Sequence, residues 1–189
     1  MPPNVARIEG PNLTLRLIQP EDAEYVYALR SDTKYNKYLS PISGTIEDQQ
    51  KWIMSYKIRE HVMSELYYVI ERGDGDRCGL VRIYQISTNS FTWGSWILDV
   101  NKPPKAALES AFLVYELAFN RLGKSQSTFE VVHENNPAID FHRRFGAVET
   151  GRNEHFVEFV YHRERYEADR ASYEAILRAD TGNSLSTKV

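Results

Sequence analysis

The sequence predicts an α+β (α/β) fold, in which helices flank a mixed, mostly antiparallel central sheet of about seven strands. One observation is the order of patterned segments: strand, two helices, three strands, helix, strand, helix, two strands. Another is the strand–helix–strand unit in the second half, which makes the sheet mixed. The third is size, because 189 residues, of which 42% are hydrophobic and 26% charged, are typical of one globular domain.

The first third of the chain is expected to form one strand and two helices. Leucines alternate with polar residues over 13–17, which is the period of a half-buried strand. Pro20 and the two acids after it open a first helix, with apolar residues at helical spacing over 23–30. The motif T-I-E-D resembles a capping box and starts a second helix at Thr45. Residues 31–44 between the helices are interpreted as a loop or broken helix.

The rest of the chain alternates strands and helices. Strands are expected over 66–71, 79–86, 91–100, 129–133, 147–150 and 155–162. Helices are expected over 105–121, 137–145 and 163–179. Gly123 ends the first of these helices, and Pro137 stands early in the second. We expect residues 180–189 to form a frayed tail.

Composition and charge exclude several classes of partner. A formal net charge of -3 provides no broad attraction to nucleic acid or to an anionic membrane, so neither is expected as a partner. Cys78 is the only cysteine, so no internal disulfide and no cysteine-based metal site is expected. The first four residues lack the features of a signal peptide, and no apolar run approaches the ~20 residues of a membrane span. A cytoplasmic enzyme without a metal is the expectation. No G-x-G-x-x-G follows a predicted strand, which argues against a dinucleotide-binding fold.

One segment carries a family resemblance. Residues 131–146 read V-V-H-E-N-N-P-A-I-D-F-H-R-R-F-G, which resembles the strand-then-helix segment of GNAT-superfamily N-acetyltransferases. The resemblance extends through A-F-N-R-L-G at 118–123, L-T-L-R-L-I-Q-P-E-D-A at 13–23 and L-R-S-D at 29–32. Two branches look similar: one acetylates the N-termini of ribosomal proteins, and the other, which is nearer, acetylates a 4-amino sugar nucleotide on the pseudaminic acid pathway. The resemblance implies a GNAT domain over 1–165, followed by a C-terminal helix and flexible tail over 166–189.

The resemblance implies that acetyl-CoA is the cosubstrate and that two central strands splay apart to hold it. The pantetheine arm would pair with a strand edge formed by the backbone of Ile97, Leu98 and Val100. Arg143 or Arg144, on the helix expected over 137–145, is a candidate for contacting the 3′-phosphate of the cofactor.

The segment expected to bind the pyrophosphate departs from the family pattern of Arg or Gln, two residues, Gly, one residue, then Gly or Ala. It reads K-P-P-K-A-A from Lys102, and its prolines have no N–H to offer. One interpretation is that Lys102 and Lys105 compensate as charged donors beside the amides of Ala106 and Ala107. The alternative is an ordinary proline-started helix with two solvated lysines.

Three residues of the resembling segment are catalytic candidates. His142 stands where the family usually has a Tyr that protonates the departing thiolate, and an imidazolium would suit that role. His133, at the strand end, is a candidate to accept the amine proton, although strand-end histidines are often structural. Asn135 is expected to orient the cofactor or a water, or to cap the following helix, and both roles can coexist.

The acceptor pocket is expected between the first two helices and their loop. Arg30 is a candidate for pairing with a substrate phosphate, and Tyr35, Tyr38 and Trp52 for stacking on a base or sugar. The alternative is that these aromatic side chains are part of the core.

The predicted function is acetyl-CoA-dependent transfer of an acetyl group to a primary amine. The acceptor expected first is a small-molecule amine, a nucleotide-linked amino sugar used in surface-polysaccharide or glycan precursor synthesis. A protein N-terminus, a polyamine or an antibiotic is the alternative acceptor, and a non-catalytic acyl-CoA-binding module is the alternative class. The family resemblance also allows a homodimer.

Overall fold

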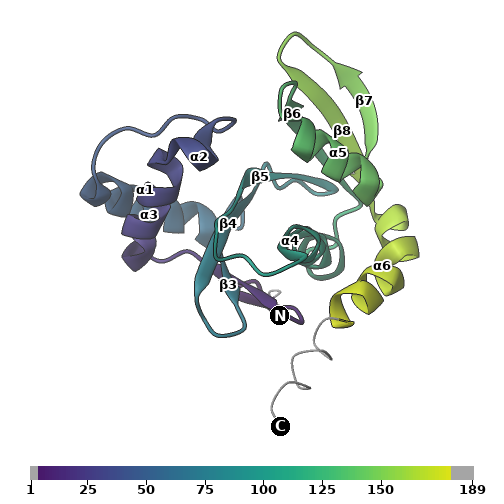
Figure 1. The fold of residues 1–189 in the computed structure, drawn as a ribbon, viewed down its shortest axis with the longest axis horizontal. Helices are drawn as coiled ribbons and strands as arrows, with labels where there is room; N and C mark the ends of the chain where they lie inside the picture. The colour runs from purple at the N-terminus through teal and green to yellow at the C-terminus, as the bar shows by residue number, and fades with distance from the viewer. Residues whose placement is uncertain (1–3, 180–189) are drawn as a thin grey trace.

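The computed structural model describes residues 4–179, within which eight strands form one mixed sheet (Figure 1). The strands are β1 (Arg7–Glu9), β2 (Leu13–Leu17), β3 (Leu66–Arg72), β4 (Arg77–Tyr84), β5 (Ser90–Leu98), β6 (Gln126–Val132), β7 (Val148–Arg152) and β8 (Phe156–His162). Their order across the sheet is β1-β2-β3-β4-β5-β6-β8-β7, and only the β5–β6 pair is parallel. The predicted fold class is confirmed, with the three-residue β1 added at one edge.

Helices cover both faces of this sheet. They are η1 (Pro20–Asp22), α1 (Ala23–Ser31), α2 (Thr33–Asn36), α3 (Ile46–His61), α4 (Ala106–Tyr115), the π-helix η2 (Glu116–Arg121), α5 (Asn136–Phe145) and α6 (Arg163–Arg178). The capping box predicted at Thr45 is confirmed, because its hydroxyl accepts from the Asp48 amide and the Asp48 carboxylate accepts from the Thr45 amide. The segment predicted as a loop or broken helix contains the single turn α2.

The two faces of the sheet bury separate cores. Along β3, Tyr68 and Ile70 point into the larger core with α4, η2 and α6, whereas Tyr67 and Val69 point into a smaller core with α1 and α3. Successive side chains of a strand point to opposite faces, so β3 has to be apolar throughout. The sheet therefore has α1 and α3 on one face and α4 to α6 on the other.

A buried carboxylate ties α4 to the start of β2. Glu109 is fully buried and accepts from the amides of Asn12 at 2.7 Å and Leu13 at 2.8 Å, and from the Asn12 side chain at 2.9 Å. A buried carboxylate needs such donors, because an unpaired one would cost several kcal/mol. These contacts hold α4 in register with the sheet.

The central strands separate soon after they meet. β5 and β6 pair only through Ser90 with Gln126 and Phe91 with Ser127. A β-bulge interrupts the β4–β5 register farther along, where Ser95 takes the left-handed conformation with φ 46°. Bulges bend the strand that contains them. The predicted splay is thus present, and it leaves one edge of β5 facing an opening.

The C-terminal helix packs on the larger core. Tyr166 and Leu177 of α6 are fully buried, and the Tyr173 hydroxyl donates to the Phe145 carbonyl at 2.9 Å. The boundary predicted between 165 and 166 falls inside this helix. The predicted tail, 180–189, lies outside the described residues. Within residues 4–179, every helix is too short or too polar to cross a bilayer.

Candidate active site

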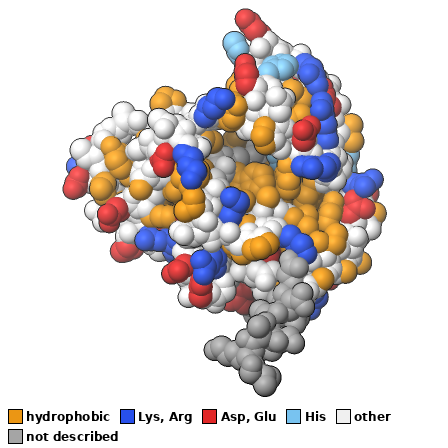
Figure 2. Space-filling view, viewed as in Figure 1, with side chains coloured by type: hydrophobic (Ala, Val, Ile, Leu, Met, Phe, Trp, Pro, Cys, Tyr) orange, Lys and Arg blue, Asp and Glu red, His pale blue; other side chains and the backbone are white. Residues whose placement is uncertain are grey.

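A crevice of about 980 Å³ opens where β5 and β6 diverge. Its walls come from the loop after α2, from β4 to β6, from the start of α5 and from the β7–β8 pair. Figure 2 shows the hollow between the two halves of the molecule, with hydrophobic side chains at its floor. A site of this size and mixed lining can hold an extended ligand.

Aromatic side chains form the floor of the crevice. Trp93 donates its indole N–H to the Tyr115 hydroxyl at 2.9 Å, and Trp96 donates to the Ser110 hydroxyl at 3.1 Å. Both donors bind α4 residues, which leaves the indole rings as apolar walls. Phe141 lies 5.1 Å from Trp96 between ring centroids and extends this wall to α5.

His142 lies within this aromatic wall, where its side chain is 6% exposed. Its ring centroid is 4.4 Å from that of Phe129 and 5.4 Å from that of Trp93. Burial lowers the pKa of His142 to about 3, because the charged form loses its hydration. The imidazole is therefore uncharged near neutral pH in this environment, which argues against the expected imidazolium proton donor. A neutral ring still carries one N–H.

Of the other two catalytic candidates, Asn135 lines the crevice and His133 does not. Asn135 lines the crevice and caps α5, accepting from the Ala138 amide at 3.4 Å. His133 lies outside the lining, and its Nε2 is 2.7 Å from the Asn153 carbonyl, to which it donates. His133 thus joins the end of β6 to the β7–β8 turn. The structure favours the structural interpretation of His133.

The turn before α4 explains the family's glycine at this position. Lys105 has φ 60°, a left-handed conformation that a glycine adopts without strain. Its Nζ donates to the Ile176 carbonyl at 3.1 Å, and the Ala106 amide donates to the Pro103 carbonyl at 3.3 Å. Of the four residues expected at the pyrophosphate, only Ala107 lines the crevice.

Lys102, the fourth of those residues, lies in the turn after β5. Its amide donates to the Asp99 carbonyl at 3.3 Å, and its side chain is not part of the crevice lining. The prolines that follow it set this turn. The predicted role of the two lysines as phosphate donors therefore finds no support in their placement.

The predicted strand edge is shorter than expected. Leu98 ends β5 and lines the crevice, whereas Ile97 is 3% exposed and packs against α1 and α3. Val100 lies beyond the strand and is 68% exposed, so its place on the edge was wrong. Of the two arginines, Arg144 lines the crevice and Arg143 pairs with Glu149 at 2.8 Å outside it.

The predicted acceptor residues divide in the same way. Tyr35 and Tyr38 line the crevice, and the Tyr38 hydroxyl donates to the Glu134 carbonyl at 2.9 Å, which bridges the two halves. Arg30 lies behind this loop and donates to the Ser40 carbonyl at 2.7 Å. Trp52 lies farther away on α3.

The ring of Trp52 packs 4.9 Å from the Tyr56 ring and 6.2 Å from the Tyr67 ring, outside the crevice lining. Its side chain is only partly covered. The alternative that this ring belongs to the packing of α3 fits its placement.

Polar residues that the sequence analysis did not select complete the acceptor side. Tyr84 of β4 lies over Gly94 of β5, where a Cβ would approach its hydroxyl to 3.3 Å, and burial raises its pKa. Glu130 of β6 and Glu158 of β8 are register partners and both line the crevice. Alternation within each strand indicates their face, but only the order β4-β5-β6-β8 brings them together.

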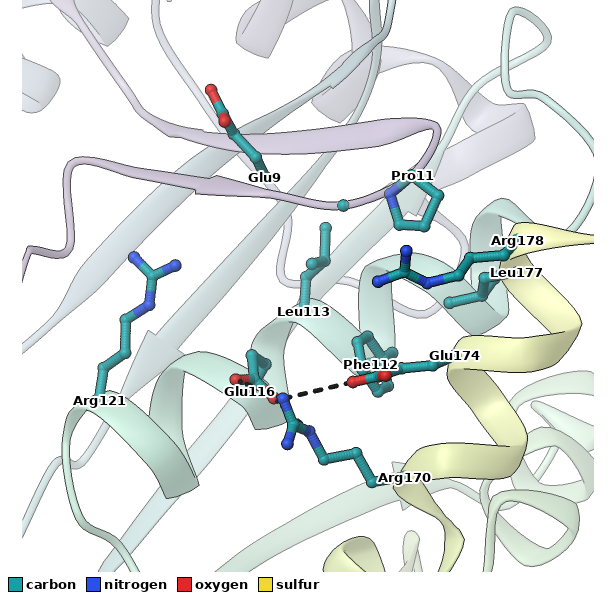
Figure 3. Close-up of a pocket in the computed structure, with 11 residues that line it drawn as sticks. Glu9, Pro11, Phe112, Leu113, Glu116, Arg121, Arg170, Glu174, Leu177 and Arg178 are labelled. Atoms are coloured by element: carbon teal, nitrogen blue, oxygen red, sulfur yellow. Dashed lines mark hydrogen bonds and ion pairs between the residues drawn. The ribbon is translucent and has the colours of Figure 1, made fainter. Parts of the chain in front are cut away.

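A second cavity of about 470 Å³ lies between the β1–β2 turn, α4, η2 and α6 (Figure 3). Glu116 stands at its centre and pairs with Arg170 at 3.1 Å. Other charged residues and the apolar side chains of Phe112, Leu113 and Leu177 line the cavity around this pair (Figure 3). Arg170 also pairs with Glu174 at 3.3 Å, so the central charges neutralise one another, as at a packing boundary between α4 and α6.

The splayed strands, the helix that begins beside them and the crevice they enclose define a GNAT-type N-acetyltransferase. The family model described as an acetyltransferase (GNAT) domain matches residues 12–148, and the chain belongs to this family. The resemblance seen in the sequence is confirmed. Acetyltransferases of this fold use acetyl-CoA, so the alternative of a non-catalytic module is set aside.

Relatives support the same assignment. The apo structure of FdhC, described as a nucleotide-linked sugar GNAT, is 37% identical with a TM-score of 0.84, covering 90% of this chain and 98% of that one. YokL of Bacillus subtilis (strain 168), an uncharacterized N-acetyltransferase derived from the SPbeta prophage, is 24% identical over 145 residues, which cover 75% of this chain and 79% of YokL. A spermidine N-acetyltransferase from Vibrio cholerae, solved with CoA and spermine, shares the fold at 19% identity and a TM-score of 0.71, covering 82% and 98% of the two chains.

Proposed function

We propose that the protein transfers the acetyl group of acetyl-CoA to the amino group of a nucleotide-linked sugar. The observation that carries this proposal is the likeness to FdhC, which extends over nearly the whole of both chains. The acceptor side of the crevice is consistent with it, because tyrosine rings and carboxylates suit a sugar that carries an amine.

Acetyl-CoA has a fitting place along the cofactor side. The edge of β5 beyond Phe91 is not taken up by pairing with β6, so its backbone groups are open to an amide-bearing arm. The first turn of α4 begins at the same opening, and the N–H groups of a first turn have no partner within the helix. The residues expected to bind the cofactor that line the crevice are Leu98, Ala107, Asn135 and Arg144.

The reaction requires the amine to lose a proton before or as it attacks. The amine nitrogen forms a bond to the thioester carbonyl carbon, the carbon–sulfur bond breaks, and the leaving sulfur takes up a proton. Glu130 and Glu158 are the carboxylates on the acceptor side of the crevice, and each can accept the amine proton directly or through water. We assign this role first to Glu130, which lies on the strand that borders the splay.

Most of the acceleration would come from positioning. His142 is neutral and buried, so it serves as a fixed wall with one N–H and not as a charged acid. Asn135 caps the start of α5 at the crevice wall. Orienting an amine against a thioester in a desolvated site is enough to provide a large part of the rate.

An acceptor screen tests the proposal. Release of the CoA thiol is followed with UDP- and dTDP-linked amino sugars, the same amino sugars without a nucleotide, spermidine, and a peptide with a free N-terminus. We expect turnover with at least one nucleotide-linked amino sugar and much slower turnover with its nucleotide-free form. Turnover of spermidine or the peptide alone would overturn the proposed acceptor while leaving the family assignment intact.

A further inference from the structure

Three arginines gather behind the acceptor end of the crevice, and we call them the arginine cluster. They are not part of the crevice lining, but Arg82 and Arg30 contact Tyr84 and Ser40, which are. Arg30 comes from α1, Arg59 from α3 and Arg82 from β4. Arg59 and Arg82 lie over the ring of Tyr56, and Arg30 acts electrostatically on the neighbouring Tyr67; both tyrosines are buried in the smaller core. Segments far apart in the sequence thus place three positive charges at one edge of the α1–α3 layer.

Ring contacts hold the guanidinium groups in place. Arg59 lies 4.6 Å above the Tyr56 ring, and Arg82 lies 5.5 Å above the same ring. Arg82 also lies 5.1 Å above the ring of Tyr84, which lines the crevice. Stacked guanidinium groups lose little further freedom when they bind a planar or tetrahedral anion.

The cluster carries more positive than negative charge. Glu65 accepts from Arg82 and lies 3.5 Å from Arg59, so two guanidinium groups share this carboxylate. Within residues 4–179, no carboxylate lies within ion-pair distance of Arg30, which instead donates to the Ser40 carbonyl. Partly buried positive charge that is not neutralised attracts an anion.

Hydrogen-bonding groups of the cluster also lack partners. Among the described residues, seven buried side-chain polar atoms have no hydrogen-bond partner, and five of these are the Nε atoms of the three arginines and the hydroxyls of Tyr56 and Tyr67. The Nε of Arg59 has only its 3.5 Å ion pair with Glu65. Such groups cost free energy when they stay unpaired, so their concentration in one place calls for a ligand that accepts hydrogen bonds.

The cluster lies on the same face of the sheet as the two acceptor-side carboxylates. Arg82 and Tyr84 are two residues apart on β4 and share a face, and Gly94, the register partner of Arg82, lines the crevice. Glu130 and Glu158 lie on that face beyond the splay. The face is therefore basic at the α1–α3 end and acidic at the β6–β8 end.

We propose that the arginine cluster binds the diphosphate of the nucleotide-linked sugar, while the amine of the same molecule reaches the carboxylates. This inference rests on the proposed function, because the opposite charges at the two ends of the face match an acceptor that is anionic at one end and cationic at the other. Arg59 and Arg82 offer forked N–H donors to phosphate oxygens, and Arg30 adds charge behind the loop at Ser40.

Calorimetric titration with UDP tests this inference. Every titration contains saturating CoA, so that UDP cannot occupy the pyrophosphate position of the cofactor. We expect UDP to bind the wild type, and Arg59→Gln and Arg82→Gln each to weaken its affinity about ten-fold or more. The matched control is Arg163→Gln, which removes an exposed arginine of α6 and should leave UDP affinity unchanged. CoA affinity measured on each variant reports whether it is folded.

A variant that should strengthen UDP binding shows that the effects do not come from misfolding. Glu65→Gln removes the negative charge of the cluster and keeps all three arginines, so UDP should bind several-fold more tightly, and this gain should shrink as salt is added. If the wild type binds UDP but neither the arginine variants nor Glu65→Gln shift its affinity in these directions, the cluster is not the diphosphate site and the proposed function stands. If neither UDP nor dTDP binds the wild type, the nucleotide-linked acceptor itself is contradicted.

Discussion

The imidazole of His142 packs against the ring of Phe129 with 4.4 Å between the ring centroids, at the floor of the crevice formed by the splayed strands. A residue that stands where this family usually has a proton-donating Tyr is therefore part of an aromatic wall. Because this burial disfavours the charged imidazole, it predicts how the stability of the protein depends on pH.

Stability should depend on the protonation of His142. Its pKa is about 3 in the folded protein and about 6.5 in an unfolded chain, so below pH 6.5 the unfolded state binds a proton that the folded state does not. The free energy of unfolding should fall by up to about 1.4 kcal/mol per pH unit as the pH is lowered from 6 toward 4. Urea unfolding of wild type and His142→Gln at several pH values measures this, and the variant should lack this part of the decrease. Parallel curves would contradict the burial of His142.

Glu109 should be essential for stability and irrelevant to chemistry. Its carboxylate accepts from two backbone amides and one side-chain amide at the start of β2, and Glu109→Ala would leave these buried donors unpaired. We expect a loss of about 3 kcal/mol or more in the free energy of unfolding. Glu167→Ala, which removes an exposed i,i+4 partner of Arg163, should cost less than about 0.5 kcal/mol. Similar losses in both variants would mean that the Glu109 contacts contribute little.

Glu130→Gln should slow acetyl transfer most at neutral pH. If Glu130 accepts the amine proton, its loss should lower kcat/KM about 100-fold near pH 7. The deficit should shrink as the pH rises toward the pKa of the acceptor amine, because the amine then loses its proton unaided. Glu158→Gln is the matched variant on the neighbouring strand and should have a smaller effect. A pH-independent deficit, or a larger one in Glu158→Gln, would remove Glu130 from the assigned role.

Replacing Lys105 by glycine should relieve backbone strain. A non-glycine residue at φ 60° costs about 1–2 kcal/mol. Lys105→Gly and Lys105→Ala both lose the Nζ contact with Ile176, so their difference isolates the backbone. We expect the Gly variant to be about 1 kcal/mol more stable than the Ala variant in thermal or urea unfolding. Equal stabilities would indicate that the turn relaxes when the side chain is removed.

Local signals in the sequence predicted the secondary structure well. The Thr45 capping box, the Asn135 cap of α5 and the helix end before Gly123 are all present. Each depends on residues three or four apart, whose geometry is set by the helix itself. The one long helix predicted over 105–121 was less accurate, because it becomes a π-helix after Tyr115.

The site was predicted less completely than the fold. Six of the candidate residues line the crevice: Asn135, Ala107, Leu98, Arg144, Tyr35 and Tyr38. His133, Lys102 and Lys105 bind nearby carbonyl groups through a side chain or backbone amide and lie outside the crevice. A residue type and its spacing indicate what a side chain is able to do, but not which partner it meets.

By itself, the sequence determined the class of fold, the order of its elements and the family, since these follow from short-range periodicity and from motifs contained in one segment. Only the tertiary structure decided which side chains share the crevice. Strand order and the packing of helices from distant segments bury His142 and place Glu130 beside Glu158 on neighbouring strands. They also bring together Arg30, Arg59 and Arg82. Desolvation and charge are properties of that assembled environment, and no single stretch of chain contains it.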